Sequence, residues 1–212
     1  MKQFRYLSHF LWLLLSGLPP ISIGTLLRPT IFASSWMILC AVGTPVAIAF
    51  VWALVLAQAI QIWVSIPRSV WQLRQSTGST RNSIWAAMVI SLASIAFQIW
   101  YSEPWLSQRV ISIYCAVYAA LVAIAASGDE KMVACVSPEA KNSDVSMVFQ
   151  LHLFKLNAVV AILALAINES LLAAQPPIST RVAVLSVLPI ALHYFYHIAL
   201  RLTCPPLDKH NS

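Results

Sequence analysis

Glu169 is the residue whose type and place most directly suggest chemistry. It follows Asn168 in the run Ile167-Asn168-Glu169-Ser170, inside an otherwise apolar stretch. An acidic side chain at the centre of a membrane helix costs about 2.5–3.5 kcal/mol on insertion scales, so such residues usually serve proton coupling, cation binding or subunit pairing. Glu169, with Asn168, is therefore a candidate ion- or proton-coupling site. The alternative is that Glu169 lies close enough to the interface, near Gln175, to reach water.

His193 and His197 form a second candidate site. They are four residues apart, so both project from one face of a helix, a spacing that can hold a metal ion in helical HExxH sites. Here the residues between them are aromatic. Counting turns places His193 on the order of 10 Å deeper in the membrane than Glu169, which argues against Glu169 as a third metal ligand. A metal or redox site at His193 and His197 is one reading. The favoured reading is an aromatic belt with histidines at the membrane interface.

Small residues recur at four-residue spacing in the stretch that contains Cys115. Such small-xxx-small ridges let membrane helices approach closely. They predict a helix-packing interface, either inside the bundle or with a partner subunit. The ridge residues are Ala116, Ala119, Ala120, Ala123 and Ser127.

Several enzyme signatures are absent from the sequence. It contains no Walker A, GxSxG, HExxH or DxD-like motif, and Glu169 is the one acidic residue inside a predicted span. Enzymes that act on phosphate groups need acidic residues for Mg²⁺, so that class and ATP-driven machines are not expected. The four cysteines are far apart and contain no CxxC pair, which predicts neither a disulfide framework nor a zinc site. No cofactor is expected.

Composition sets the class of protein to which these residues belong. Apolar residues make up 59% of the 212 residues, charged residues 9%, and the mean hydropathy is +0.77. A soluble domain is roughly 45–50% apolar and about 25% charged, so soluble enzymes and disordered chains are excluded. The net charge of +6 fits cytoplasmic loops rich in Lys and Arg rather than a nucleic-acid partner.

Six apolar stretches are candidates for membrane-spanning helices, because a crossing needs roughly 20 apolar residues. Polar segments at about 67–83 and 128–150 are the predicted cytoplasmic loops, and residues 1–212 form a single transmembrane domain. The candidate spans are about 8–27, 31–66, 84–101, 109–127, 155–174 and 181–200, with a break at Arg28-Pro29 between the first two.

The stretch 31–66 is long enough to be either one helix kinked at Pro45 or a hairpin that turns at Gly43-Thr44-Pro45. With one span, ten of the 13 Lys and Arg residues lie inside; splitting the stretch leaves nine of them outside. The positive-inside bias therefore favours one span and an N-in/C-in arrangement. Cleavage after Ser22-Ile23-Gly24 by signal peptidase is an alternative that would leave five spans.

These observations predict an all-α, polytopic bundle of about six transmembrane helices in a bacterial inner membrane. The favoured function is a non-enzymatic one, in which the chain contacts other membrane proteins as a subunit or accessory factor. Secretion or transfer assemblies, exclusion factors and immunity factors are examples of that class.

One alternative is a small proton- or cation-coupled transporter that uses Glu169. The other is a membrane enzyme or redox protein that uses His193 and His197. The expected partners are the lipid bilayer and other membrane subunits, and no nucleic acid.

Overall fold

The computed structural model describes residues 18–21, 23–75, 79–128 and 147–203, and every element in this part of the chain is an α-helix. Five of the helices are long and apolar enough to cross a membrane, and α4 contains a shorter apolar stretch, Trp85–Tyr101. The prediction of a polytopic helical membrane bundle is confirmed. The helices are α2 (Ile23–Ala41), α3 (Val46–Gln75), α4 (Ser79–Tyr101), α5 (Pro104–Ala126), α7 (Met147–Ala174) and α8 (Ile178–Thr203).

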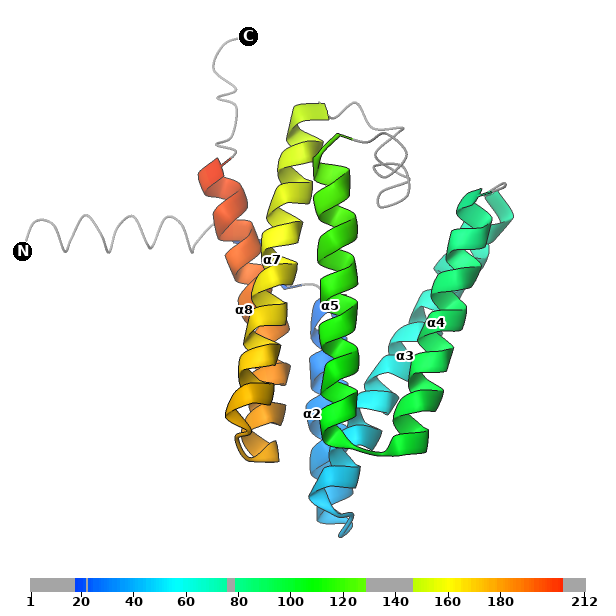
Figure 1. The fold of residues 1–212 in the computed structure, drawn as a ribbon, viewed down its shortest axis with the longest axis vertical. Coiled ribbons are helices and arrows are strands. Elements are labelled where there is room, and N and C mark those ends of the chain that lie inside the picture. The colour runs from blue at the N-terminus through cyan, green and yellow to red at the C-terminus, as the bar shows by residue number, and fades with distance from the viewer. Residues whose placement is uncertain (1–17, 22, 76–78, 129–146, 204–212) are drawn as a thin grey trace, which may run out of the picture.

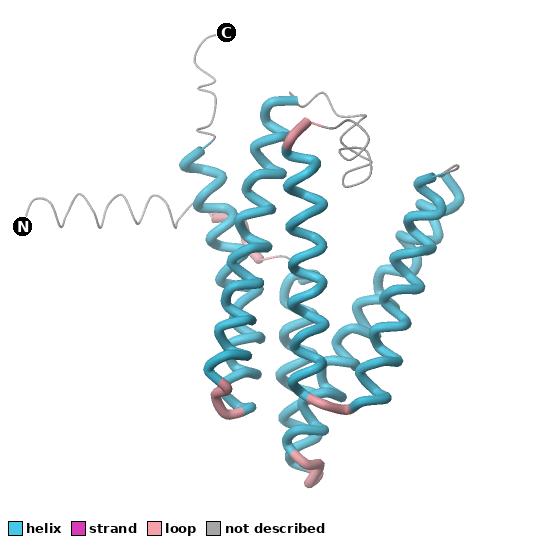
Figure 2. Tube along the Cα trace, viewed as in Figure 1, coloured by secondary structure: helices cyan, strands magenta, loops and turns pink. Residues whose placement is uncertain are grey.

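Successive helices run in opposite directions along the bundle (Figure 1). The short connections α2–α3, α4–α5 and α7–α8 lie together at one end, which we call the short-turn end (Figure 2). The C-terminal ends of α3 and α5 and the N-terminal ends of α4 and α7 lie at the opposite end. Residues close to a short turn on one helix are therefore at the same depth as residues close to a short turn on its neighbour.

The stretch 31–66 is a hairpin, so the prediction of a single kinked span is wrong. Gly43 has φ +91° and its N–H donates to the Cys40 carbonyl at 3.1 Å, while the Thr44 N–H donates to the Leu39 carbonyl at 3.0 Å. This pair of hydrogen bonds is the Schellman motif, which ends a helix at a glycine that adopts the left-handed conformation. Pro45 then begins the next helix rather than kinking a continuous one.

Charge counting misled because the predicted break at Arg28-Pro29 is also wrong. Both residues lie inside α2, where Pro29 is buried. The α2–α3 hairpin thus supplies the first two described crossings, and the later helices keep their predicted directions. The remainder of the predicted span 8–27, up to residue 17, lies outside the described residues. Helices α3 and α4 also occupy most of the predicted loop 67–83.

The centre of the bundle is the N-terminal half of α3. Phe50 and Val51 there are fully buried, and Phe32 of α2 packs edge-on against Phe50 with ring centroids 5.7 Å apart. Val182 of α8 completes this core. A second, smaller cluster joins α5 to α7 near the opposite end, through Val122, Ala125, Phe154 and Ala158.

Helices α3 and α4 form a second hairpin, which leans away from α5. The distance between this α3–α4 hairpin and α5 increases away from the short-turn end (Figure 1). One polar contact joins α3 to α4, and another joins α4 to α5. The buried Gln98 amide of α4 donates to Gln58 Oε1 of α3 at 2.9 Å, and Tyr114 of α5 donates its hydroxyl to Ser94 Oγ at 3.1 Å. The second of these hydrogen bonds joins the α3–α4 hairpin to the middle of α5.

The corrected topology predicts which side of the membrane residue 44 faces. In a variant that lacks the native cysteines, Thr44→Cys should react with a membrane-impermeable maleimide from the same side as Glu103→Cys. Ser127→Cys should react from the opposite side, because α5 crosses between Glu103 and Ser127. Protection of Thr44→Cys from both sides would contradict the hairpin.

Candidate functional site

The buried polar residues of α5 gather in its first three turns. The helix begins after Glu103, whose extended backbone (φ −103°, ψ 126°) caps it, and Pro104 occupies the first turn, where its missing N–H is not needed. Ser107 and Gln108 are fully buried there, and Ser112 is nearly so. The start of α5 is therefore a polar surface facing other helices, at the short-turn end of the bundle.

Asn168 joins α7 to this polar surface. Its side chain is fully buried, and Nδ2 donates to the Gln108 carbonyl oxygen at 3.0 Å and to Ser112 Oγ at 2.8 Å. Buried polar groups need such partners in hydrocarbon, where no water replaces them. Asn168 thus acts in this structure as a clamp between α5 and α7.

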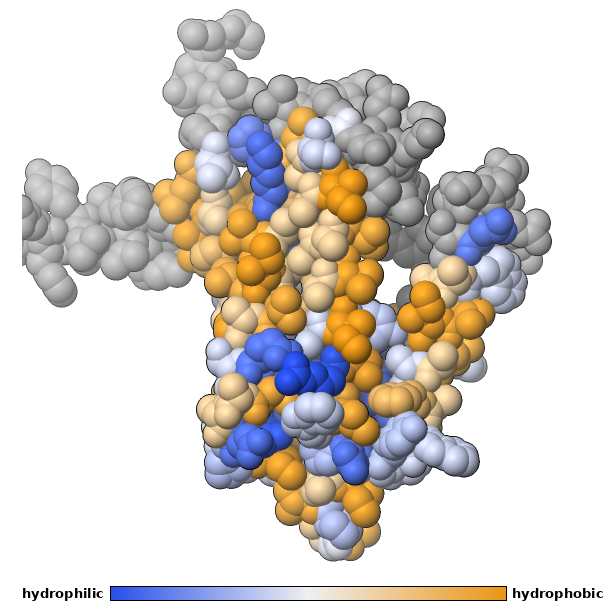
Figure 3. All heavy atoms as spheres, viewed as in Figure 1, coloured by the Kyte–Doolittle hydropathy of each residue, from blue (hydrophilic) through white to orange (hydrophobic). Residues whose placement is uncertain are grey.

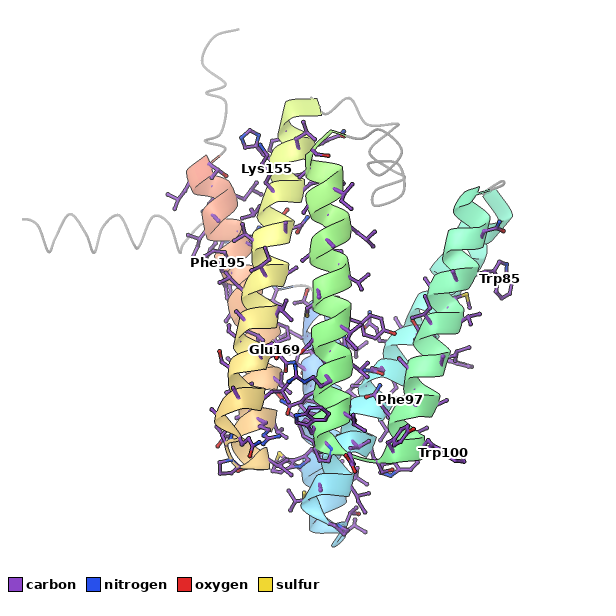
Figure 4. All side chains as sticks on the ribbon, viewed as in Figure 1. Trp85, Phe97, Trp100, Lys155, Glu169 and Phe195 are labelled. Atoms are coloured by element: carbon purple, nitrogen blue, oxygen red, sulfur yellow. The ribbon has the colours of Figure 1, made fainter. Side chains whose placement is uncertain are left out.

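Glu169 lies beside this clamp and forms an ion pair with Arg109. The Arg109 guanidinium donates to Glu169 Oε2 at 2.7 Å, and the two side chains are 42% and 37% exposed. Each residue is five positions from the nearest helix end, Pro104 or Ala174, which is about 8 Å along the axis. The carboxylate therefore lies near the short-turn end, on the lateral surface of the bundle, between α5 and α7 (Figure 4).

Arg181 extends the cluster to α8. Its Nε donates to the Pro176 carbonyl at 2.9 Å and its terminal nitrogen donates to Gln108 Oε1 at 3.0 Å. Gln108 is consequently shared: its carbonyl accepts from α7 and its side chain accepts from α8. Three helices thus meet through one glutamine, and two arginines accompany one glutamate.

Three polar atoms of this cluster are buried and have no hydrogen-bond partner among the described residues: Ser107 Oγ, Gln108 Nε2 and Asn168 Oδ1. The coupling role predicted for Glu169 and Asn168 stays a prediction. What the contacts show is that Asn168 bonds to α5 and that the carboxylate of Glu169 already accepts from a guanidinium.

The histidine pair lies apart from this cluster, on α8 toward the opposite end. The rings of His193 and His197 have centroids 4.5 Å apart at an interplanar angle of 68°. Within the described ranges, no group of three or more His, Cys, Asp or Glu residues is placed to hold a metal ion. The metal or redox reading of His193 and His197 stays a prediction.

The small-residue ridges of α5 divide between two environments. Ala119 is buried in the bundle, next in register to the buried Val122. The other ridge residues face outward, so most of the predicted packing surface is not used within the described chain. The outward members are Ala116, Ala120, Ala123 and Ser127.

Sequence reasoning did not identify the residues that bind Asn168 and Glu169. In the sequence Arg109 is only the first residue of the predicted span 109–127, yet its distance from Pro104 equals that of Glu169 from the end of α7. Matching those distances across the short turns would have paired them. Gln108 and Ser112, four positions apart, are a weaker signal of a polar helix face.

The clamp predicts that Asn168→Leu destabilises the bundle. The change removes two interhelical hydrogen bonds, one to Ser112 Oγ and one to the Gln108 carbonyl, so the free energy of unfolding should fall by about 1–2 kcal/mol. Unfolding in mixed detergent and SDS, followed by circular dichroism, measures it. Ser170→Ala is the matched control, because that hydroxyl is exposed and bonds only to Ala166 of its own helix. Equal effects of the two changes would contradict the clamp.

No protein-family model, no curated protein and no solved structure matches this chain. The contacts above are therefore the guide to its function. They show that polar side chains hold three helices together near the short-turn end of the bundle. One ion pair of this group is partly exposed on the lateral surface.

Proposed function

We propose that this chain is a non-enzymatic, multi-pass membrane protein that works by packing against other membrane proteins, as a subunit or accessory factor of a membrane complex. The observation that carries the proposal is the exposure of the apolar side chains of α4. This helix spans 23 residues, Ser79–Tyr101, and most of its described apolar side chains are exposed, among them Val89, Leu92 and Trp100. Exposed apolar side chains of a membrane helix face either lipid or a neighbouring helix, and a neighbouring helix adds van der Waals packing.

The packing of α4 favours association. It contacts α3 more extensively than α5, to which the Tyr114–Ser94 hydrogen bond joins it. Trp85 and Trp100 point away from the bundle (Figure 4), and Trp100 is 84% exposed. A partner helix beside α4 would cover these side chains. It would give α4 another packing neighbour, as α5 and α7 already have in each other.

The polar residues inside the helices also support a non-enzymatic role. Glu169 pairs with Arg109, Asn168 bonds to Ser112, and Gln98 bonds to Gln58, each across two helices of the same chain. Their hydrogen bonds hold helices together. In the proposed setting the membrane is a bacterial inner membrane. The short-turn end faces away from the cytoplasm, because it holds Arg109 and Arg181, whereas the helix segments at the opposite end contain five basic residues, Arg68, Arg74, Arg81, Lys155 and Arg201.

Photo-cross-linking from matched valines tests this function. Val89 of α4 and Val187 of α8 are 60% and 59% exposed, so they report two helices at equal accessibility. With a photoreactive residue at position 89, irradiation of native membranes should give one discrete adduct with another membrane protein, in stoichiometric yield. The same residue at position 187 should give little of that adduct.

Two outcomes would contradict the proposal. One is an equal pattern of adducts from the two positions. The other is a purified chain that moves a solute or turns over a substrate without any second protein. In that case Glu169→Gln would be the first variant to assay for lost flux.

A further inference from the structure

The partly exposed ion pair of Arg109 and Glu169 belongs to a longer surface on the side of the bundle. Arg109 shares one side of α5 with the outward small residues, because separations of three, four and seven positions return to the same side of a helix. The side chains along that side run from a tryptophan near the short-turn end to a serine at the opposite end. They are Trp105, Arg109, Ala116, Ala120, Ala123 and Ser127, and all except the half-exposed Arg109 are exposed.

Helix α7 contributes the other half of this face. Ile162, which is 54% exposed, lies seven positions before Glu169 and so on the same side of α7. Because Arg109 and Glu169 meet across the two antiparallel helices, both sides open in one direction. We call this surface the α5–α7 face. Figure 3 shows it, with hydrophilic residues toward the short-turn end and apolar residues over the middle.

The ion pair uses little of its hydrogen-bonding capacity. A guanidinium has five N–H donors and a carboxylate has two acceptor oxygens, whereas one bond of 2.7 Å joins Arg109 to Glu169 Oε2. The Trp105 ring lies 5.2 Å from the Arg109 guanidinium carbon and covers part of it. What remains open is a positive and a negative group, side by side and at one depth.

We propose that a second copy of this chain docks on the α5–α7 face. Two copies inserted in the same orientation are related by a two-fold axis along the membrane normal, which preserves depth. Arg109 of one copy then meets Glu169 of the other, and the reverse, so the face is complementary to itself. The outward alanines Ala116, Ala120 and Ala123 allow close approach of the backbones along the rest of the face.

Charge complementarity favours a second copy over a lipid headgroup. A phosphate that approaches Arg109 also approaches the Glu169 carboxylate, which has the same sign of charge. A second copy offers an opposite charge to each of the two groups. This interface is separate from the α4 surface, so a partner on α4 and a second copy on the α5–α7 face can each be present without the other.

Charge reversal in two differently tagged copies tests the pairing. Arg109→Glu gives a copy with two acidic groups on the face, and Glu169→Arg gives a copy with two basic groups. Each variant alone should lose co-purification of its two tags by about tenfold, a change equal to roughly 1.4 kcal/mol. Mixed, the two variants should co-purify as well as the unchanged chain, because both contacts between residues 109 and 169 of the two copies are then between opposite charges.

Cysteine cross-linking gives an answer that does not depend on the charge variants folding. In a variant that lacks the native cysteines, Ala120→Cys should form a disulfide-linked dimer in native membranes on mild oxidation. Leu121→Cys is the matched control, since it is exposed at the same depth but about 100° round the helix. Its yield of dimer should be several times lower.

Selective rescue by the mixed charge variants, with a dimer from Ala120→Cys, supports the second copy. A monomeric native mass in lipid nanodiscs together with equal cross-linking at residues 120 and 121 would overturn it. So would a different protein linked through Ala120→Cys in place of the second copy. Pairing that appears only when anionic lipid is present, and that the charge variants leave unchanged, would assign the ion pair to lipid and also overturn it.

Discussion

The amide of Asn168 fixes how α5 and α7 stand against each other. It donates to two groups one turn apart on α5, the Gln108 carbonyl and Ser112 Oγ, and so allows one register. In that register Glu169 faces Arg109 and Gln108 is free to accept from Arg181. A slip of one turn, about 5.4 Å, would break all of these contacts together. The Asn168 amide is fully buried, and in hydrocarbon no water would replace its two hydrogen bonds.

Composition was sufficient to predict the class, because 9% charged residues cannot cover a soluble globule. The sequence also singled out Asn168 and Glu169, since polar groups in an apolar run are conspicuous. It did not predict Arg109 or Arg181 as partners, because pairing depends on depth and depth depends on where each helix begins. The start of α5 at Pro104, five residues before the predicted boundary, places Arg109 more than one turn inside the helix instead of at its first residue.

The hairpin at Gly43 shows how a local signal can be outweighed by a global one. Gly43 followed by Pro45 is a stop and a start for helices, readable from sequence alone. Charge counting opposed it only because residues 8–27 were taken as a separate crossing. Once α2 runs from Ile23 through Pro29, the hairpin and the distribution of basic residues agree. The Gln58–Gln98 contact between α3 and α4 lay beyond prediction, since it joins residues 40 positions apart.

The divergence of α3 and α4 gives the chain a tapered outline. Near the short-turn end the described helices are gathered together, and toward the α3–α4 turn the hairpin stands apart from α5 (Figure 1). A protein with this outline displaces more area from one leaflet than from the other. The two monolayers around it must then differ in lateral packing, and the elastic energy of the bilayer becomes sensitive to which way the surrounding membrane bends.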